Sequence, residues 1–220
     1  MGLFSKRGKT LYTPGPLAAA RLPEVVAATK ATLRDMGVDI VELDLKSGFE
    51  AWYAGYEQEF QELMRENKRI LEQHGITHII TNDPHEAWTY RERYGIETRH
   101  VIEVCKEHIS KIVKGEVRRA NYHHPCFLDK LGVNPNTAKS VLRRAGVHVP
   151  NENQSRGCCG SVGHDFERNN KDEAEAIAKE RAKTLSEPLI ITCCPHCLLL
   201  LKHHHKKTKD VMQILAEADQ

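Results

Sequence analysis

Hydrophobic residues recur along the chain in two patterns, one at helical spacing and one in short continuous runs. The helical pattern is clearest over residues 57–73, where the apolar side chains fall on one face and Gly75 follows as a stop signal. That face consists of Phe60, Leu63, Met64 and Leu71. A second helix is predicted over residues 22–36, because Pro23 lies in its first turn and Gly37 follows its end.

The short apolar runs predict buried strands between the helices. Strands are expected at residues 38–43, 76–81, 117–122, 147–150 and 189–192. Further helices are expected at residues 136–144 and 169–186, with two more before Gly115 and two at the end of the sequence. Strands that alternate with helices are typical of an α/β fold in which helices flank parallel sheets. In such folds, functional residues collect in loops beyond the carboxyl ends of the strands.

Two halves of the sequence repeat each other. The phrase IITNDPHE at residues 79–86 returns as IITCCPHC at residues 190–197, and YTPGP at residues 12–16 lies opposite YHHPC at residues 122–126. Matches that keep nearly the same spacing over two halves indicate an internal duplication. We therefore predict two pseudo-symmetric, Rossmann-like lobes, formed by residues 9–116 and 117–220.

Cysteines distinguish the two copies. Five of them lie in three predicted loops of the second half, namely Cys126, Cys158, Cys159, Cys194 and Cys197. The first half has Pro16, Asp83 and Glu86 opposite three of these positions, and the stretch LKSGFE at residues 45–50 opposite the CCG turn. The scaffold is thus present twice, whereas the thiols are present once.

Five thiols in three loops favour a metal cluster. Cys194 and Cys197 form a CxxC turn, which places two sulfurs on one metal centre in zinc and iron–sulfur sites. Adjacent side chains such as Cys158 and Cys159 do not easily bind one small ion together. A tetrahedral zinc ion is complete with four ligands, so five thiolates fit a larger group better.

The order of these motifs resembles the cysteine-rich CCG domain found in the disulfide-cleaving subunit of heterodisulfide reductase. The same domain occurs in iron–sulfur subunits of lactate and glycolate oxidases and of some succinate or fumarate reductases. The resemblance rests on YHHPC ending at Cys126, on the triplet Cys158-Cys159-Gly160, and on CPHC from Cys194 to Cys197. It covers nearly the whole chain, because these proteins commonly carry two such domains in tandem, and it makes the first copy here a degenerate one.

The resemblance implies a function as well as a fold. It implies that the five cysteines hold a noncubane [4Fe-4S] cluster in an electron-transfer subunit of a redox complex, which is active with a flavoprotein or a ferredoxin-like partner. In heterodisulfide reductase, two such clusters flank a disulfide and cleave it. This chain lacks the ligands of the first cluster, so a second one would come from a homodimer mate or another subunit.

Two alternatives use the same cysteines differently. In one, they bind zinc and fix the loops of a structural or interaction module. In the other, Cys194 and Cys197 act as a metal-free dithiol in a disulfide oxidoreductase. An iron–sulfur protein is brown, a zinc protein is colourless, and a dithiol enzyme keeps its chemistry after metal removal.

Several other polar and sulfur residues are secondary candidates. His123 and His124 precede Cys126, where an imidazole could donate a hydrogen bond to a sulfur or move a proton near a bound disulfide. Cys193 is expected to be a passive neighbour, and Cys105 a small buried hydrophobic residue. His196 lies opposite His85, which favours a structural role for both histidines. Asp83, His85 and Glu86 could hold a hard ion, but we expect a relaxed, solvent-facing loop there, in a half that covers the cluster.

Composition restricts the remaining function classes. The 32 basic and 30 acidic residues nearly balance, which argues against nucleic acid as the main partner. The sequence contains neither a membrane-spanning apolar run nor a secretory signal. A cytoplasmic protein is therefore expected, and there cysteines serve as metal ligands or redox groups rather than structural disulfides. No GxGxxG fingerprint follows a strand, so a flavin or nicotinamide site would lie on another chain.

Overall fold

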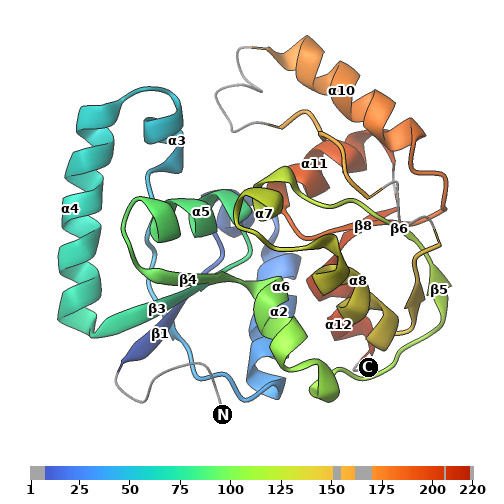
Figure 1. Cartoon of the computed structure of the whole chain (residues 1–220), viewed down its shortest axis with the longest axis horizontal. Helices are drawn as coiled ribbons and strands as arrows, with labels where there is room; N and C mark the ends of the chain where they lie inside the picture. The colour runs from blue at the N-terminus through green and yellow to red at the C-terminus, as the bar shows by residue number, and fades with distance from the viewer. Residues whose placement is uncertain (1–7, 151–154, 162–169, 206, 219–220) are drawn as a thin grey trace.

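The computed structural model describes residues 8–150, 155–161, 170–205 and 207–218, and it shows an α/β fold with parallel sheets flanked by helices (Figure 1). The first half contains a four-stranded parallel sheet in the order β2-β1-β3-β4. Its strands are β1 (Lys9–Thr13), β2 (Val41–Glu42), β3 (Ile76–Thr81) and β4 (Glu97–His100). No helix in these described ranges is long and apolar enough to cross a membrane.

The second half repeats this strand order in two shorter parallel sheets. Its strands are β5 (Arg118–Arg119), β6 (Asn121–Tyr122), β7 (Val147–His148), β8 (Ile190–Thr192) and β9 (Thr208–Asp210). β5 pairs with β7, and β6, β8 and β9 follow in that order. Only Ala120 separates β5 from β6, so these two short strands together correspond to β1. The strand order of the second half, β7, β5/β6, β8 and β9, then matches the order β2, β1, β3 and β4 of the first half. This match supports the predicted duplication.

The helices connect the strands and cover the sheets. Those of the first half are α1 (Pro16–Arg21), α2 (Pro23–Asp35), α3 (Phe49–Tyr53), α4 (Glu57–His74), α5 (Pro84–Glu92) and α6 (Val101–Glu107), and a 3-10 turn follows at Ile109–Lys111. Those of the second half are α7 (Cys126–Lys130), α8 (Pro135–Arg144), α10 (Lys171–Lys183), α11 (Pro195–His204) and α12 (Val211–Ala218).

Three strands were not predicted, and several predicted ones are shorter. β4 and β9 consist of polar residues, ETRH and TKD, so they carry no apolar signal, and backbone pairing at the sheet edge makes them strands. β1 was also missed. The runs at 38–43 and 147–150 each form only two residues of strand, and the run at 117–122 is split into β5 and β6.

The two halves pack against each other reciprocally. α2 of the first half packs on α12 of the second, and α8 of the second packs on α6 of the first. Likewise, α1 packs on α11 and α7 packs on α5. In the first two contacts, α8 is the counterpart of α2 and α6 is the counterpart of α12. In the last two, α7 is the counterpart of α1 and α5 is the counterpart of α11. Each contact thus occurs twice with the halves interchanged, which is the pattern of a pseudo-twofold axis.

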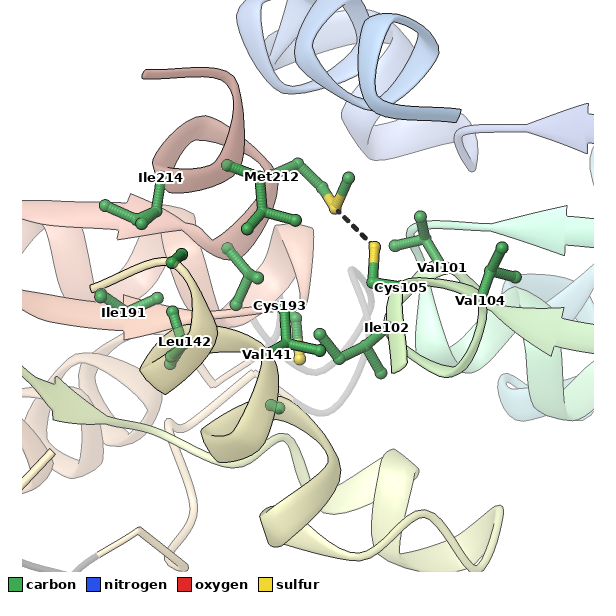
Figure 2. Close-up of a cluster of buried hydrophobic side chains, with 14 of the residues drawn as sticks. Val101, Ile102, Val104, Cys105, Val141, Leu142, Ile191, Cys193, Met212 and Ile214 are labelled. Carbon is green, nitrogen blue, oxygen red and sulfur yellow. Dashed lines mark hydrogen bonds between the residues drawn. The ribbon is translucent and has the colours of Figure 1, made fainter. Parts of the chain in front are cut away.

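One hydrophobic core runs through this contact between the halves. Val101, Ile102 and Cys105 of α6 lie in the same buried cluster as Leu142 of α8 and Met212 of α12 (Figure 2). The Sγ of Cys105 lies 3.9 Å from the Sδ of Met212, so this cysteine is the small buried hydrophobic residue that the sequence predicts. Because side chains of both halves fill one core, neither half buries its own apolar surface alone.

Candidate metal centre

The loops that carry the cysteines meet at the point where the strand order of the second half reverses. The chain leaves β6 toward β7 on one side and returns to β8 on the other side. Cys126 begins α7 just after β6, whereas Cys194 is the N-cap of α11 just after β8. A topological switch point leaves a crevice at the carboxyl ends of two neighbouring strands, which explains why these cysteines lie together.

Three of the five predicted ligands are buried and close together. The Sγ atoms of Cys159 and Cys197 lie 3.1 Å apart, and Cys194, like these two, is almost inaccessible to solvent. Cys126 and Cys158 are exposed. Although Cys126 as a whole is exposed, partial burial of its thiol, followed by the charges of Cys194, Cys159 and Cys158, raises its pKa to about 11, so its sulfur lies near theirs. The thiols thus form a group with a buried inner side and an open outer side.

The CCG turn depends on its glycine. Gly160 has a φ of +92°, and a Cβ at this position would lie 2.3 Å from the carbonyl oxygen of Ala174 in α10. Its backbone N–H donates to the Sγ of Cys158 at 3.3 Å. Only glycine allows both this left-handed conformation and the close approach of α10, so the triplet fixes how Cys158 and Cys159 are presented.

His123 is the one of the two candidate histidines that faces the sulfurs. Its ring is fully buried, and it shares a group of ligand atoms within 4.8 Å of one another with Cys159 and Cys197. The Nε of Arg181 donates to its Nδ1 at 3.1 Å. The proton of a neutral His123 therefore lies on Nε2, which has no hydrogen-bond partner among the described residues. This N–H is thus available to a sulfur.

The surroundings of Cys159 favour the ionised form of its thiol. Its hydrogen bond with Cys197 lowers its pKa well below the usual range against the effect of burial, and the neighbouring His123 lowers it further. Arg181 of α10 lies near both Cys159 and Cys197. Burial lowers the pKa of its guanidinium, and the charges of these two cysteines partly offset that effect. A thiolate held this way is prepared to bind a metal.

His124 and Cys193 point elsewhere. Nδ1 of His124 lies 3.2 Å from the hydroxyl of Tyr122, and its Nε2 lies 3.3 Å from Asp129. Cys193 hydrogen-bonds the same Tyr122 hydroxyl at 3.1 Å and belongs to the central hydrophobic core. In the first half, the Tyr12 hydroxyl donates to Asn82 at 2.6 Å, which is the counterpart of that contact. Cys193 is therefore a core residue rather than a member of the sulfur group.

The first half corrects one expectation. Asp83, His85 and Glu86 do not lie in a solvent-facing loop; their exposed fractions are 2%, 3% and 3%. Glu86, opposite Cys197, accepts hydrogen bonds from the backbone N–H of Ser47 at 2.9 Å and from its hydroxyl at 2.6 Å. Gly48 follows with a φ of +81°, as Gly160 follows Cys159. Hence Ser47 and Glu86 occupy the places of Cys159 and Cys197.

Arg181 and Ser47 were not identified from the sequence. Arg181 lies in a helix rich in charged residues, where an arginine is ordinarily solvated. The available signal was its spacing, because Arg181 lies seven residues after the buried Ala174 and three after the buried Ala178. Ser47 could have been found by aligning Ser47-Gly48 with Cys159-Gly160.

The residues present fit an iron–sulfur group. Thiols from three loops converge, an N–H donor without a partner in the described residues faces them, and the glycine turn holds two adjacent cysteines at the same place. Four of the thiols would also satisfy a zinc ion. A simple dithiol would need neither the third loop nor the exposed Cys126.

Comparison with known proteins identifies the family. A family model described as a cysteine-rich domain, CCG, matches residues 10–86 and 120–202. The fold is also that of a hypothetical protein from Helicobacter pylori, whose crystal structure matches 97% of this chain with a TM-score of 0.66 and 11% identity, over 49% of that protein.

Two curated relatives contain a similar region. One, "Probable membrane-anchored ferredoxin" of Chromohalobacter salexigens, is 23% identical over 84% of this chain. The other, "Probable iron-sulfur-binding oxidoreductase FadF" of Bacillus subtilis, is 26% identical over 74%. This chain spans 32% and 26% of their lengths. Since the family model matches most of the chain, in two copies, this protein belongs to the family of CCG cysteine-rich domain proteins.

Proposed function

We propose that the chain is an iron–sulfur electron-transfer subunit that holds a noncubane [4Fe-4S] cluster through Cys126, Cys158, Cys159, Cys194 and Cys197. The observation that carries this proposal is the convergence of three loops at one switch point. There, Cys159 and Cys197 lie 3.1 Å apart. Cys194 lies close to Cys197, and the charges of Cys194, Cys159 and Cys158 reach Cys126. Five sulfurs with an adjacent pair among them exceed the needs of a single tetrahedral ion.

The residues around the thiols are suited to one-electron transfer. A bound cluster would accept and release single electrons. The Nε2–H of His123 would donate to a sulfur, and the guanidinium of Arg181 would offset the added negative charge. Burial of Cys159, Cys194 and Cys197 excludes water from the inner side, whereas exposed Cys126 and Cys158 leave the outer side open to a redox partner or a substrate.

We infer that the protein works within a larger redox assembly in the cytoplasm. The two curated relatives, named as a ferredoxin and as an iron–sulfur oxidoreductase, are three to four times longer than the matched region. We expect a flavoprotein or a ferredoxin-like protein to exchange electrons with the cluster. As in heterodisulfide reductase, the open side would receive a thiol or disulfide substrate, with a second cluster supplied by another subunit or a homodimer mate.

The test is an absorption spectrum with iron, sulfide and zinc analysis of the anaerobically purified protein. We expect a brown protein with about four irons per chain. Cys159→Ser should remove the colour and most of the iron. Cys105→Ala, which also removes a buried thiol but lies in the hydrophobic core, should retain both. A colourless wild-type protein with one zinc would overturn the proposal and support the zinc-stabilised module.

A further inference from the structure

A second group of metal-ligating side chains lies between the two halves. Asp83 and His85 belong to the first half, and His196 belongs to the second. Their ligand atoms all lie within 4.8 Å of one another. Oδ1 of Asp83 lies 2.9 Å from Nδ1 of His85, and Oδ2 lies 3.2 Å from Nε2 of His196. One carboxylate thus bridges two imidazoles.

The pseudo-twofold arrangement of the fold brings these residues together. His85 lies in the first turn of α5 and His196 in the first turn of α11, and these helices correspond to each other in the two halves. The two rings meet with their centroids 4.6 Å apart. Asp83 is the N-cap of α5 and accepts from the backbone N–H of His85 at 2.9 Å, which fixes its carboxylate.

This group of three side chains is almost completely shielded from solvent. All three side chains are buried, and the rings of Phe127 and Phe49 lie 4.1 Å and 4.8 Å from the ring of His85. Nε2 of His85 has no hydrogen-bond partner among the described residues. An anionic carboxylate buried among aromatic rings requires a nearby positive charge, which either a protonated His196 or a bound cation supplies.

We propose that Asp83, His85 and His196 bind a divalent zinc ion, at a site separate from the cysteines. Two imidazoles and one carboxylate are a common donor set for this ion, with bonds of about 2.0 to 2.2 Å. Ligand atoms around such a tetrahedral ion are separated by about 3.3 Å. The two oxygens of Asp83 lie 2.9 and 3.2 Å from the ring nitrogens they face, and one ligand atom from each residue lies within 4.8 Å of the others. The hydroxyl of Ser161, in the CCG loop, lies 3.4 Å from Nδ1 of His196 and orients that ring.

This site would bridge the two halves with one ion. It does not depend on the iron–sulfur proposal, because its ligands contain no sulfur and two of them, Asp83 and His85, belong to the half that has no cysteine ligands. Glu86, the neighbouring buried carboxylate, is excluded from the ligand set because both of its oxygens are used by Ser47.

The experiment is zinc analysis and zinc K-edge X-ray absorption on the full-length protein, purified anaerobically and equilibrated with zinc. Iron of the cluster does not contribute at this absorption edge. We expect one zinc per chain with nitrogen and oxygen neighbours at about 2.0 Å and no sulfur shell. Asp83→Asn and His196→Gln should each weaken zinc binding at least tenfold, while the iron content of Asp83→Asn remains that of the wild type.

Glu86→Gln is the matched control. It removes the negative charge of a buried carboxylate at the start of the same helix, without removing a ligand, and should change zinc affinity less than twofold. Absence of zinc from the wild-type protein would overturn the site even if a variant fails to fold. Zinc with sulfur neighbours at about 2.3 Å would also overturn it, and would assign the zinc to the cysteines instead.

Discussion

At the residue scale, one structural position shows how differently the two halves solve the same task. Asp210 is buried at the start of α12, where its carboxylate accepts from the backbone N–H of Met212 at 2.8 Å. Its counterpart at the start of α6 is His100, whose ring accepts from Ile102. Among the described residues, the charge of Asp210 raises the pKa of four acids, namely Tyr12 of β1, Tyr122 of β6, Cys105 of α6 and Cys193 after β8. No described base lowers the pKa of Asp210 itself.

This isolation predicts a pH dependence of stability. Burial raises the pKa of Asp210 to about 7, against the hydrogen bond from Met212. Because the folded-state pKa lies above the unfolded value, the stabilising contribution of protonated Asp210 is complete below about pH 4 and is lost as the pH rises through about 7. The free energy of unfolding should therefore fall by about 2 kcal/mol between pH 5.5 and 7.5.

Asp210→Asn keeps the capping oxygen but cannot ionise. Urea unfolding at several pH values should show a clearly flatter profile for this variant than for the wild type, and higher stability at pH 7.5. Parallel profiles of the two proteins would show that Asp210 does not titrate in this range.

At the scale of elements, the CCG turn and α10 form one unit. The left-handed Gly160 lets the turn approach the backbone of Ala174, and Arg181 from the same helix reaches His123 and the carbonyl oxygen of Ser155, at 3.1 and 2.9 Å. In the first half, Gly48 lies against α4 in the corresponding way, but there the nearest atoms belong to side chains, because a Cβ on Gly48 would first meet the side chain of Leu63. Side chains can move aside, whereas the backbone of α10 cannot.

Gly160→Ala should therefore be more damaging than an ordinary loss of a left-handed glycine. The change adds a backbone clash at 2.3 Å to the usual conformational cost of about 1 to 2 kcal/mol. We expect loss of most bound iron and a drop in the free energy of unfolding of about 3 kcal/mol or more.

The control is Gly55→Ala, at a glycine with a φ of +86° and no heavy atom within 4 Å of the added carbon. It should cost only the conformational term and leave the iron content unchanged. Equal effects of the two substitutions would mean that the approach of α10 is not what the CCG glycine provides.

At the scale of the whole molecule, the shared core makes the two halves one folding unit. Both tryptophans, Trp52 and Trp88, belong to the first half, so their fluorescence follows the unfolding of that half and, at Trp88, the loss of its contact with Phe127. Hydrogen exchange of the β8 amides reports on the second half. The free energies of unfolding from these two probes should agree, because exposing one half would uncover the apolar face of the other.

The boundary between residues 116 and 117 provides a second test of this prediction. The fragment 117–220 expressed alone should not fold, since α8 and α12 would lose their partners α6 and α2. Two separate unfolding transitions, or a folded fragment, would instead establish the lobes as independent domains.

The elements with strong periodic signals were predictable, and those decided by neighbours were not. Residues 57–73 form α4 from Glu57 to His74, and residues 76–81 form β3, because an amphipathic helix and a continuous apolar run follow from local sequence. The polar strand β9 has no such signal and exists because β8 offers its backbone at the edge. The sequence predicts a solvent-facing loop at Asp83, whereas packing between the halves buries this residue.

By itself, the sequence determined the α/β class, the repeat, the family resemblance and the five cysteines, because spacing of residue types is a local property of the chain. Only the tertiary structure decided which side chains meet. It placed Arg181 behind His123, turned His124 away from the sulfurs and brought His196 to Asp83 across the two halves. These contacts join residues up to 113 positions apart, and their geometry follows from how the helices pack around a common core rather than from any short stretch of sequence.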